Sequence, residues 1–295
     1  MANSKVTRCT LQEVQGIPLL EPIVQHWEKV EAFQAFPEDL LIVTYPKAGT
    51  TWTQEIVDLI LHGGDAETVR RAPTSTRMPF LEISTPQASH PGIIQLEKMD
   101  PPRVIKSHLP IQLLPKSFWE SGSKVIYVAR NPKDTLVSYF HFDRMNMVQP
   151  EPGPWSGYQK KFMEGQLGWG SWYEHVKGYW KEKDKRNIHY LFYEDMKENP
   201  AREIQRIAKF LGHRLSEDIL NNIVQLTTFD AMRENPMANY SSVPGNLFDR
   251  KASDFLRKGE VGDWKNHLSP EENAAFEKHY VETMSDCEIP FRFVI

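Results

Sequence analysis

The feature that most constrains the fold is a short apolar segment running directly into a loop with lysine and threonine and then into a helical pattern. Residues 40–45 are almost continuously apolar, as in a buried strand. After Thr50, apolar side chains recur at helical spacing up to His62, and Gly63-Gly64 ends the run. The segment predicts a strand–loop–helix unit with its loop at the carboxyl end of the strand.

Three further apolar segments predict strands: Val104–Ser107, Val125–Ala129 and His189–Phe192. Two more helices are indicated, one from Asn131-Pro132 through Met145 and one from Pro200 to Leu211, closed by Gly212. Strands that alternate with helices favour a mainly parallel sheet with ligands at the carboxyl ends of its strands. We therefore expect one α/β domain over residues 1–295, a central sheet flanked by helices, with a P-loop-like phosphate-binding unit.

Two segments interrupt this alternation: Asn146–Gly157 and Asn235–Trp264. Loops of this length in a compact domain are usually functional or disordered. Because both contain large apolar residues, we expect them to be lids over a binding site.

Composition limits the function classes. Hydrophobic residues make up 40% and charged residues 25%, as in ordinary folded proteins, and the net charge of −4 argues against general binding of nucleic acid. No segment approaches the roughly 18 apolar residues of a membrane span, and the first eight residues lack the apolar core of a secretion signal, so we expect a cytoplasmic protein. Cys9 and Cys287 are expected to be free thiols, with no disulfide and no metal site.

The loop after the first strand has the chemistry of an anion site. Backbone N–H groups and the positive end of the helix converge there, beside Lys47 and the hydroxyls of Thr50 and Thr51. The spacing differs from a P-loop, in which a Gly-Lys-Ser/Thr follows an earlier glycine. The strand that ends at Ala129 is followed by Arg130 and not by an acidic metal ligand. A nucleotide-dependent kinase is thus a weaker alternative. The positive charge of Arg130 after this strand suits a second phosphate group of the ligand.

These residues resemble a known family. Residues 45–52, Tyr-Pro-Lys-Ala-Gly-Thr-Thr-Trp, are similar to the 5′-phosphosulfate loop of cytosolic sulfotransferases, in which serine is common at the place of Ala48. Further similar segments follow in the family's order at residues 106–108, 127–134, 191–196 and 257–264. Chain length and residues 150–153, Pro-Glu-Pro-Gly, resemble the phenol (aryl) branch, family 1, more than the hydroxysteroid branch.

The resemblance implies an activity. Such enzymes transfer the sulfuryl group of 3′-phosphoadenosine-5′-phosphosulfate (PAPS) to a hydroxyl, leave 3′-phosphoadenosine-5′-phosphate (PAP) and need no metal. The expected acceptors are small phenols, among them xenobiotic phenols, oestrogens and thyroid hormones, with roles in detoxification and hormone metabolism. A non-catalytic carrier of phenolic hormones is a second alternative, although a carrier needs neither a base nor a leaving-group cation.

By resemblance, His108 is the general base of an in-line attack, and Lys47 and Lys106 stabilise the leaving oxygen and the sulfuryl oxygens. The cofactor-binding residues are expected to be Lys47, Ala48, Gly49, Thr50, Thr51, Trp52, Arg130, Ser138, Tyr193, Thr227, Phe229, Phe255, Arg257, Lys258 and Gly259. The acceptor is expected to contact Phe80, Ile83, Lys106, His108, Phe142, Val148, Tyr240, Val243, Leu247 and Phe248.

Two positions modify these expectations. Asn146 lies where a carboxylate would favour a cationic amine, so we expect a preference for neutral phenols. The family's dimer motif is altered here at Ser269, Pro270 and Ala274, since proline lacks an N–H donor and alanine lacks a carboxylate. A homodimer is possible, but the usual one is in doubt.

Overall fold

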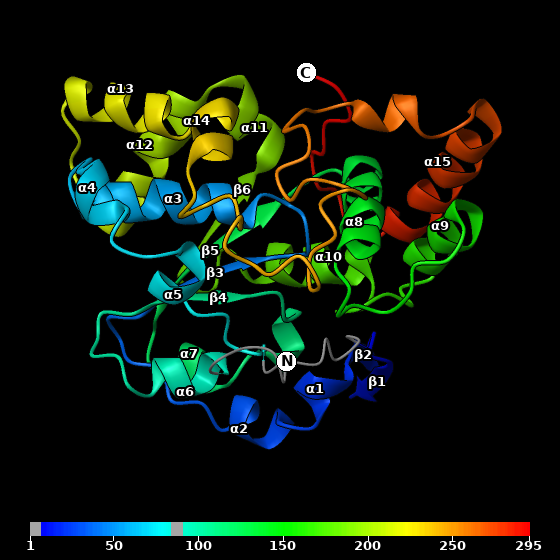
Figure 1. Ribbon diagram of the computed structural model, residues 1–295, viewed down its shortest axis with the longest axis horizontal. Helices are drawn as coiled ribbons and strands as arrows, with labels where there is room; N and C mark the ends of the chain where they lie inside the picture. The colour runs from blue at the N-terminus through cyan, green and yellow to red at the C-terminus, as the bar shows by residue number, and fades with distance from the viewer. Residues whose placement is uncertain (1–6, 84–90) are drawn as a thin grey trace.

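The computed structural model describes residues 7–83 and 91–295. Its centre is a four-stranded parallel sheet in the order β4-β3-β5-β6 (Figure 1). The strands are β3 (Leu40–Thr44), β4 (Val104–Ser107), β5 (Lys124–Ala129) and β6 (Ile188–Phe192). All four predicted strands are confirmed to within a residue at each end. Because the four strands are parallel, the loops that follow them lie along one edge of the sheet.

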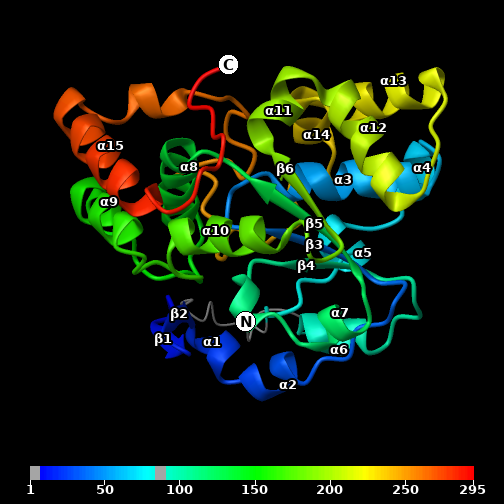
Figure 2. The same cartoon turned by 180° about the vertical axis from the view of Figure 1, so that it is seen from behind.

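Alternate residues of each strand pack into two different cores. Ile42, Ile126 and Val128 face α3 (Thr50–Leu61), α12 (Pro200–Leu211) and α13 (Glu217–Leu226). Val43 and Tyr127 face the opposite side, where α8 (Pro132–Met145), α9 (Trp155–Met163), α10 (Trp172–Glu182) and α15 (Pro270–Met284) pack. This alternation is the two-residue period of a strand buried on both faces. Figures 1 and 2 show the helices on the two sides of the sheet, so the fold is a single α/β domain as expected.

The predicted helices α3, α8 and α12 are present, and further elements surround them. A hairpin of β1 (Leu11–Val14) and β2 (Ile17–Leu20) lies near the N-terminus. The remaining elements are α1 (Glu21–Val24), α2 (Trp27–Glu31), α4 (Ala66–Val69), α5 (Thr74–Arg77), α6 (Gly92–Leu96), η1 (Ile111–Leu113), α7 (Ser117–Glu120), α11 (Tyr193–Glu198), α14 (Phe229–Glu234) and η2 (Asp263–Asn266).

The two segments expected as lids lie against each other. The Met147 N–H donates to Leu247 O at 2.8 Å and the Asp249 N–H to Met145 O at 2.8 Å. The first segment is shorter than expected, because α9 begins at Trp155 directly after Pro154. In the second, Arg250 Nη2 donates to the carbonyl oxygens of residues 240, 241 and 243. One arginine therefore fixes the turn that brings this segment over the sheet edge.

Two features are absent from the described residues. None of the described helices is long and apolar enough to cross a membrane. Nor do three or more histidine, cysteine or acidic side chains gather there as a metal ion requires. Both cysteines, Cys9 and Cys287, are free thiols.

Candidate active site

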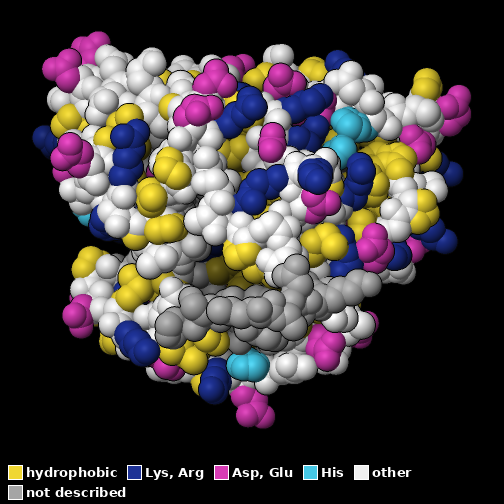
Figure 3. All heavy atoms as spheres, viewed as in Figure 1, with side chains coloured by type: hydrophobic (Ala, Val, Ile, Leu, Met, Phe, Trp, Pro, Cys, Tyr) yellow, Lys and Arg dark blue, Asp and Glu magenta, His cyan; other side chains and the backbone are white. Residues whose placement is uncertain are grey.

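A cavity of about 700 Å³ lies at the carboxyl edge of the sheet. Figure 3 shows this face of the molecule hollowed, with hydrophobic side chains around the hollow. All of the predicted site residues except Ala48 line this one cavity. They come from parts of the chain up to about 200 residues apart; for example, Lys47 Nζ lies 3.4 Å from Phe255 O. Ala48 is fully buried beneath the loop, and its N–H donates to Tyr45 O at 3.2 Å.

The loop between β3 and α3 turns in the left-handed region. Lys47 has φ 68° and Gly49 has φ 108°, and Gly49 is the N-cap of α3 without a capping side chain. The first N–H groups of α3 are therefore available to an anion. A Cβ at Gly49 would lie 2.8 Å from Tyr193 Cδ2, so glycine also allows the tyrosine ring to close on the loop.

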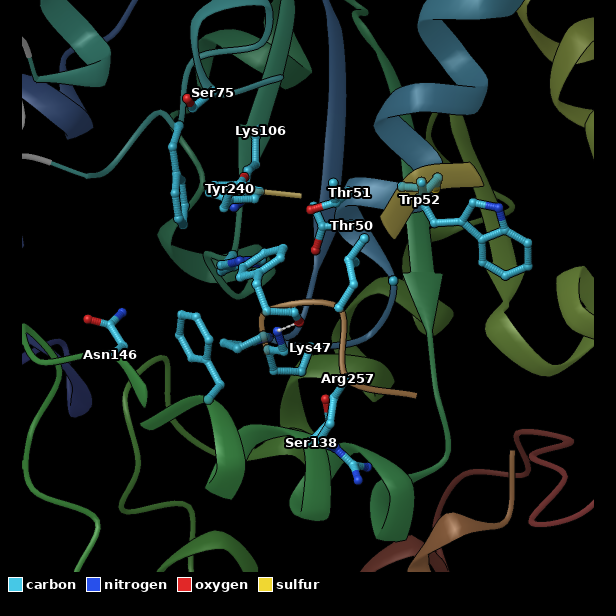
Figure 4. A pocket seen from close by; sticks show the side chains of 18 of the residues that line it. Lys47, Thr50, Thr51, Trp52, Ser75, Lys106, Ser138, Asn146, Tyr240 and Arg257 are labelled. Atoms are coloured by element: carbon cyan, nitrogen blue, oxygen red, sulfur yellow. Dashed lines mark hydrogen bonds between the residues drawn. The ribbon is translucent and has the colours of Figure 1, made fainter. Parts of the chain in front are cut away.

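Lys47 lines the cavity, with Phe142 of α8 and Phe255 of the second lid segment beside it; Figure 4 shows where Lys47 lies. Its Nζ is 4.2 Å from the ring centroid of Phe255 and 4.5 Å from that of Phe142. Burial, together with the charges of the nearby Lys106, Arg130 and Arg257, lowers the pKa of Lys47 to about 7. A bound anion would favour the charged lysine again, which is what a phosphosulfate site requires.

A second group of cations, Arg130, Arg257 and Lys258, lines another part of the cavity. Arg130 donates to Lys47 O at 3.2 Å and to Glu260 O at 2.8 Å, and its guanidinium lies 4.4 Å from the Tyr193 ring centroid. Asp263 accepts from Arg257 at 2.7 Å and from Lys258 at 2.5 Å. Burial alone raises the pKa of Asp263, but these hydrogen bonds outweigh it and hold the pKa well below its usual range.

Two buried donors in this cation group have no protein partner. Within the described parts of the chain, Arg130 Nε and Arg257 Nε form no hydrogen bond. A buried guanidinium N–H without a partner is costly, and phosphate oxygens are well suited to satisfy it. Ser138 of α8 lines the same cavity. The residues therefore fit a ligand with two separate phosphate groups.

Flat side chains enclose the space beside the phosphate sites. Trp52 and Tyr193 meet edge to face with centroids 5.5 Å apart. Gly259 has φ 67°, and a Cβ there would lie 2.3 Å from Phe229 Cδ2, so glycine allows close packing of the ring. Thr227 lines the same wall. An apolar slot of this kind suits a purine base.

The imidazole of His108 is held in one tautomer. Its Nδ1 lies 2.8 Å from Thr44 O, which can only accept, so Nδ1 carries the proton and Nε2 the lone pair. Nε2 has no hydrogen-bond partner among the residues described, and His108 lines the cavity. Burial holds the pKa of His108 well below 6.5, and the charge of Lys106 lowers it further. The ring is therefore a neutral base facing the ligand space.

The backbone of His108 is fixed from both sides. Its N–H donates to Glu82 Oε1 at 2.7 Å, and its carbonyl accepts from His175 Nε2 at 2.9 Å. Tyr127 of β5 donates its hydroxyl proton to His175 Nδ1 at 2.7 Å. Thr44, Glu82 and His175 were not identified from the sequence. Only Thr44 carried a signal, its place at the end of a predicted strand.

Lys106 extends from β4 into the cavity. Its Nζ lies 4.0 Å from the Phe80 ring centroid, and burial lowers its pKa to about 8. The backbone of Lys106 pairs with residues 79–81 through two hydrogen bonds, Lys106 N to Pro79 O and Leu81 N to Lys106 O. Lys106 and His108, two residues apart, both line the cavity as expected.

The rest of the cavity is mainly apolar and aromatic. The ring centroids of Tyr240 and Phe255 are 4.0 Å apart, and Phe142 lies 6.0 Å from both Phe248 and Phe255. The remaining expected acceptor contacts line the same walls: Ile83, Val148, Val243 and Leu247. The paired lid segments thus provide most of one wall beside His108.

Comparison with known proteins defines the class. The family model for the sulfotransferase domain matches residues 37–288, so the chain belongs to the sulfotransferase family. More narrowly, its curated relatives place it in family 1 of the cytosolic sulfotransferases. Mouse sulfotransferase 1 family member D1 is 49% identical, over 97% of each chain. Human sulfotransferase 1C2 is 48% identical, over 95% of each chain. Dog sulfotransferase 1B1 is 47% identical, over 97% of this chain and 96% of the relative.

Solved structures show the same fold. A retinol dehydratase in complex with androsterone and the inactive cofactor PAP has a TM-score of 0.87 at 25% identity, over 95% of this chain and 90% of that one. Mouse sulfotransferase SULT7A1, complexed with PAP, has a TM-score of 0.78 at 29% identity, over 94% and 96%. The protein is therefore a sulfotransferase that uses PAPS as its donor and a small molecule as its acceptor.

Proposed function

We propose that this sulfotransferase sulfates the hydroxyl of small phenols, with His108 as general base. The observation that carries the proposal is the geometry of His108. Its Nδ1–H is engaged by Thr44 O, and its Nε2 lone pair has no partner in the described chain. A group that accepts the acceptor's proton must have such a free lone pair in the ligand space.

The basicity of His108 favours phenols over aliphatic alcohols. Burial keeps the pKa of the imidazole low, so it is a weak base. A phenol, with a pKa near 10, releases its proton to a weak base far more readily than an aliphatic alcohol does. The aromatic wall around Phe142 and Phe248 suits a flat ring.

The two lysines have separate roles in this proposal. PAPS supplies the sulfuryl group and a bisphosphorylated leaving group. Lys47, beside the helix N-terminus, stabilises the charge on the leaving oxygen, and Lys106 lies on the side of His108 and stabilises the sulfuryl oxygens. Preorganised donors of this kind contribute about 10²–10³ in rate each. Simple phenols, oestrogens and iodothyronines are all candidate acceptors.

The test compares His108→Ala with the parent protein, measuring sulfation of 4-nitrophenol and binding of PAP by calorimetry. We expect kcat to fall by about 10²–10⁴ while the Kd for PAP stays unchanged. His189→Ala is the matched control, since His189 is also largely buried but lies outside the cavity. A kcat near that of the parent in His108→Ala would remove the assignment of the base.

The charge preference is tested separately with two acceptors, dopamine and 4-nitrophenol. Asn146, an uncharged residue, lines the acceptor side of the cavity. A cationic amine would lose hydration there without gaining a carboxylate partner. We expect a higher kcat/KM for 4-nitrophenol, and a much higher value for dopamine would contradict the proposal.

A further inference from the structure

Two carboxamide side chains, Asn146 and Gln149, lie in the otherwise apolar acceptor wall. Both line the cavity, and their exposed fractions are only 8% and 5%. Figure 4 shows Asn146 on the side of the cavity away from Trp52, with Lys47 between them. Asn146 therefore lies at the end of the cavity away from Trp52, and Arg8 holds the backbone of Gln149 near that of Asn146.

The polar atoms of this pair are only partly satisfied by the protein. Asn146 Oδ1 accepts from the Val148 N–H at 2.9 Å, which fixes the orientation of the amide and leaves its Nδ2 hydrogens for another acceptor. Among the described residues, neither Asn146 Nδ2 nor the amide of Gln149 has a hydrogen-bond partner. A ligand with a matching polar group can therefore form hydrogen bonds with these amides.

The loop that carries the pair is fixed from behind by Arg8. Arg8 Nη1 lies 3.0 Å from Asn146 O and 3.1 Å from Gln149 O, so one nitrogen holds both residues next to each other. The Cys9 N–H also donates to Val148 O at 2.9 Å. Such a backbone holds its side chains in place before a ligand binds, which reduces the entropic cost of recognition.

The ionisable groups around this loop present no net charge to the cavity. Arg8 Nε pairs with Glu151 at 2.7 Å, so its charge is balanced on the outer side. Asp143 accepts from the Tyr158 hydroxyl at 2.7 Å, and burial raises its pKa to about 8, so it is mostly protonated near neutral pH. A pair of amides without a charged neighbour matches a neutral oxygen better than a carboxylate.

We propose that Asn146 and Gln149 form a second polar subsite, which binds a neutral hydroxyl or carbonyl oxygen at the end of the acceptor remote from the reacting phenol. The preferred acceptors are then elongated phenols with such an oxygen. The inference rests on the proposed phenol sulfation, and it names which phenols the site selects.

The test uses two acceptors that differ only at the remote end, 4-hydroxybiphenyl and 4′-acetyl-4-hydroxybiphenyl. One satisfied hydrogen bond corresponds to about tenfold in kcat/KM in favour of the acetyl compound. Gln149→Met keeps the length of the side chain but removes its polar atoms, so this preference should fall severalfold. Gln159→Met is the matched control, because Gln159 is equally buried but lies outside the cavity, and it should retain the full preference.

Two results separate failure of the subsite from failure of the proposed function. An equal preference for the acetyl compound in the parent and in Gln149→Met, with normal PAP affinity in both, would overturn the subsite. If the parent sulfates neither phenol, the proposed function fails. The subsite is then still tested by calorimetric titration of both biphenyls into the PAP complex, where loss of the affinity difference in Gln149→Met supports it and an unchanged difference refutes it.

Discussion

The contact between Gly259 and Phe229 allows a quantitative prediction. In Gly259→Ala the new Cβ would lie 2.3 Å from Phe229 Cδ2 and 2.9 Å from Cε2, closer than carbon atoms can approach. The ring must therefore move. Because Phe229 lines the proposed adenine slot, the substitution should weaken binding of PAP although residue 259 itself gains no charge or polar group.

Two separate free energies are involved. Alanine at a φ of 67° costs about 1–2 kcal/mol of backbone strain, which is present with and without ligand and lowers Tm by a few degrees. Stacking of a base on an aromatic ring contributes about 1–3 kcal/mol. Loss of that stacking raises the Kd for PAP by about 5- to 150-fold.

Calorimetric titration of PAP into a double-mutant cycle measures the effect. If alanine acts by displacing the ring, Gly259→Ala should change the affinity by less than about 0.5 kcal/mol in a Phe229→Ala background. Gly245→Ala is the matched control, since it lies in the same lid segment and an added Cβ there meets nothing within 4 Å. An unchanged Kd in Gly259→Ala, or full additivity in the cycle, would refute the reasoning.

Three further predictions follow from other parts of the molecule. The pKa of Lys47 is lowered to about 7, so this lysine is mainly neutral in the free protein at about pH 8, and binding of anionic PAP should take up a proton and weaken as pH rises. Calorimetry in buffers of different ionisation enthalpy should show this proton uptake, and the uptake should be smaller in Lys47→Met. No uptake in the parent protein would contradict the prediction. The pKa of Asp143 is raised from 3.8 to about 8 in the folded protein, so between these values the carboxyl ionises only in the unfolded chain, and the native state becomes less stable as pH rises. The Tm of Asp143→Asn minus the Tm of the parent should therefore grow between about pH 5 and pH 8. A constant difference would count against the prediction. Ser269 caps α15 in a capping box with Glu272, and Pro270 is the first residue of that helix, so these residues of the altered dimer motif are engaged within their own chain. Gel filtration over a hundredfold range of protein concentration should therefore give a monomer. A stable dimer would disprove the prediction.

Local patterns explain what could be predicted. The strand from Leu40, its loop and α3 are contiguous, so periodicity and loop chemistry sufficed to locate them. The same holds for β5 and α8, where Asn131 caps the helix through Asp134 N at 2.9 Å. The expected donor-binding and catalytic residues came from family resemblance, and all of them except Ala48 line one cavity.

Contacts between distant segments could not be predicted. His175 orients His108 from 67 residues away, and a single histidine in an amphipathic helix has no signal that distinguishes it from a core residue. The pairing of Met147 with Leu247 joins loops without regular periodicity. The positions of Asn146 and Gln149 depend on Arg8, whose role is visible only once the chain has folded.

The attachment of the two lid segments has a consequence for how the substrate range of such a protein can diverge. His108 and Lys106 are carried by the sheet edge, whereas most of the proposed acceptor wall is carried by two irregular segments. Arg8 holds the first segment to the N-terminal part of the chain, and Arg250 holds the turn within the second, in both cases through main-chain carbonyls. Because every residue has a main-chain carbonyl, these contacts can remain when the side chains of the segments are exchanged. Substitutions in these segments can therefore change which acceptor is chosen while the transfer chemistry and the loop path are inherited intact, and the two arginines are the positions where such tolerance should end.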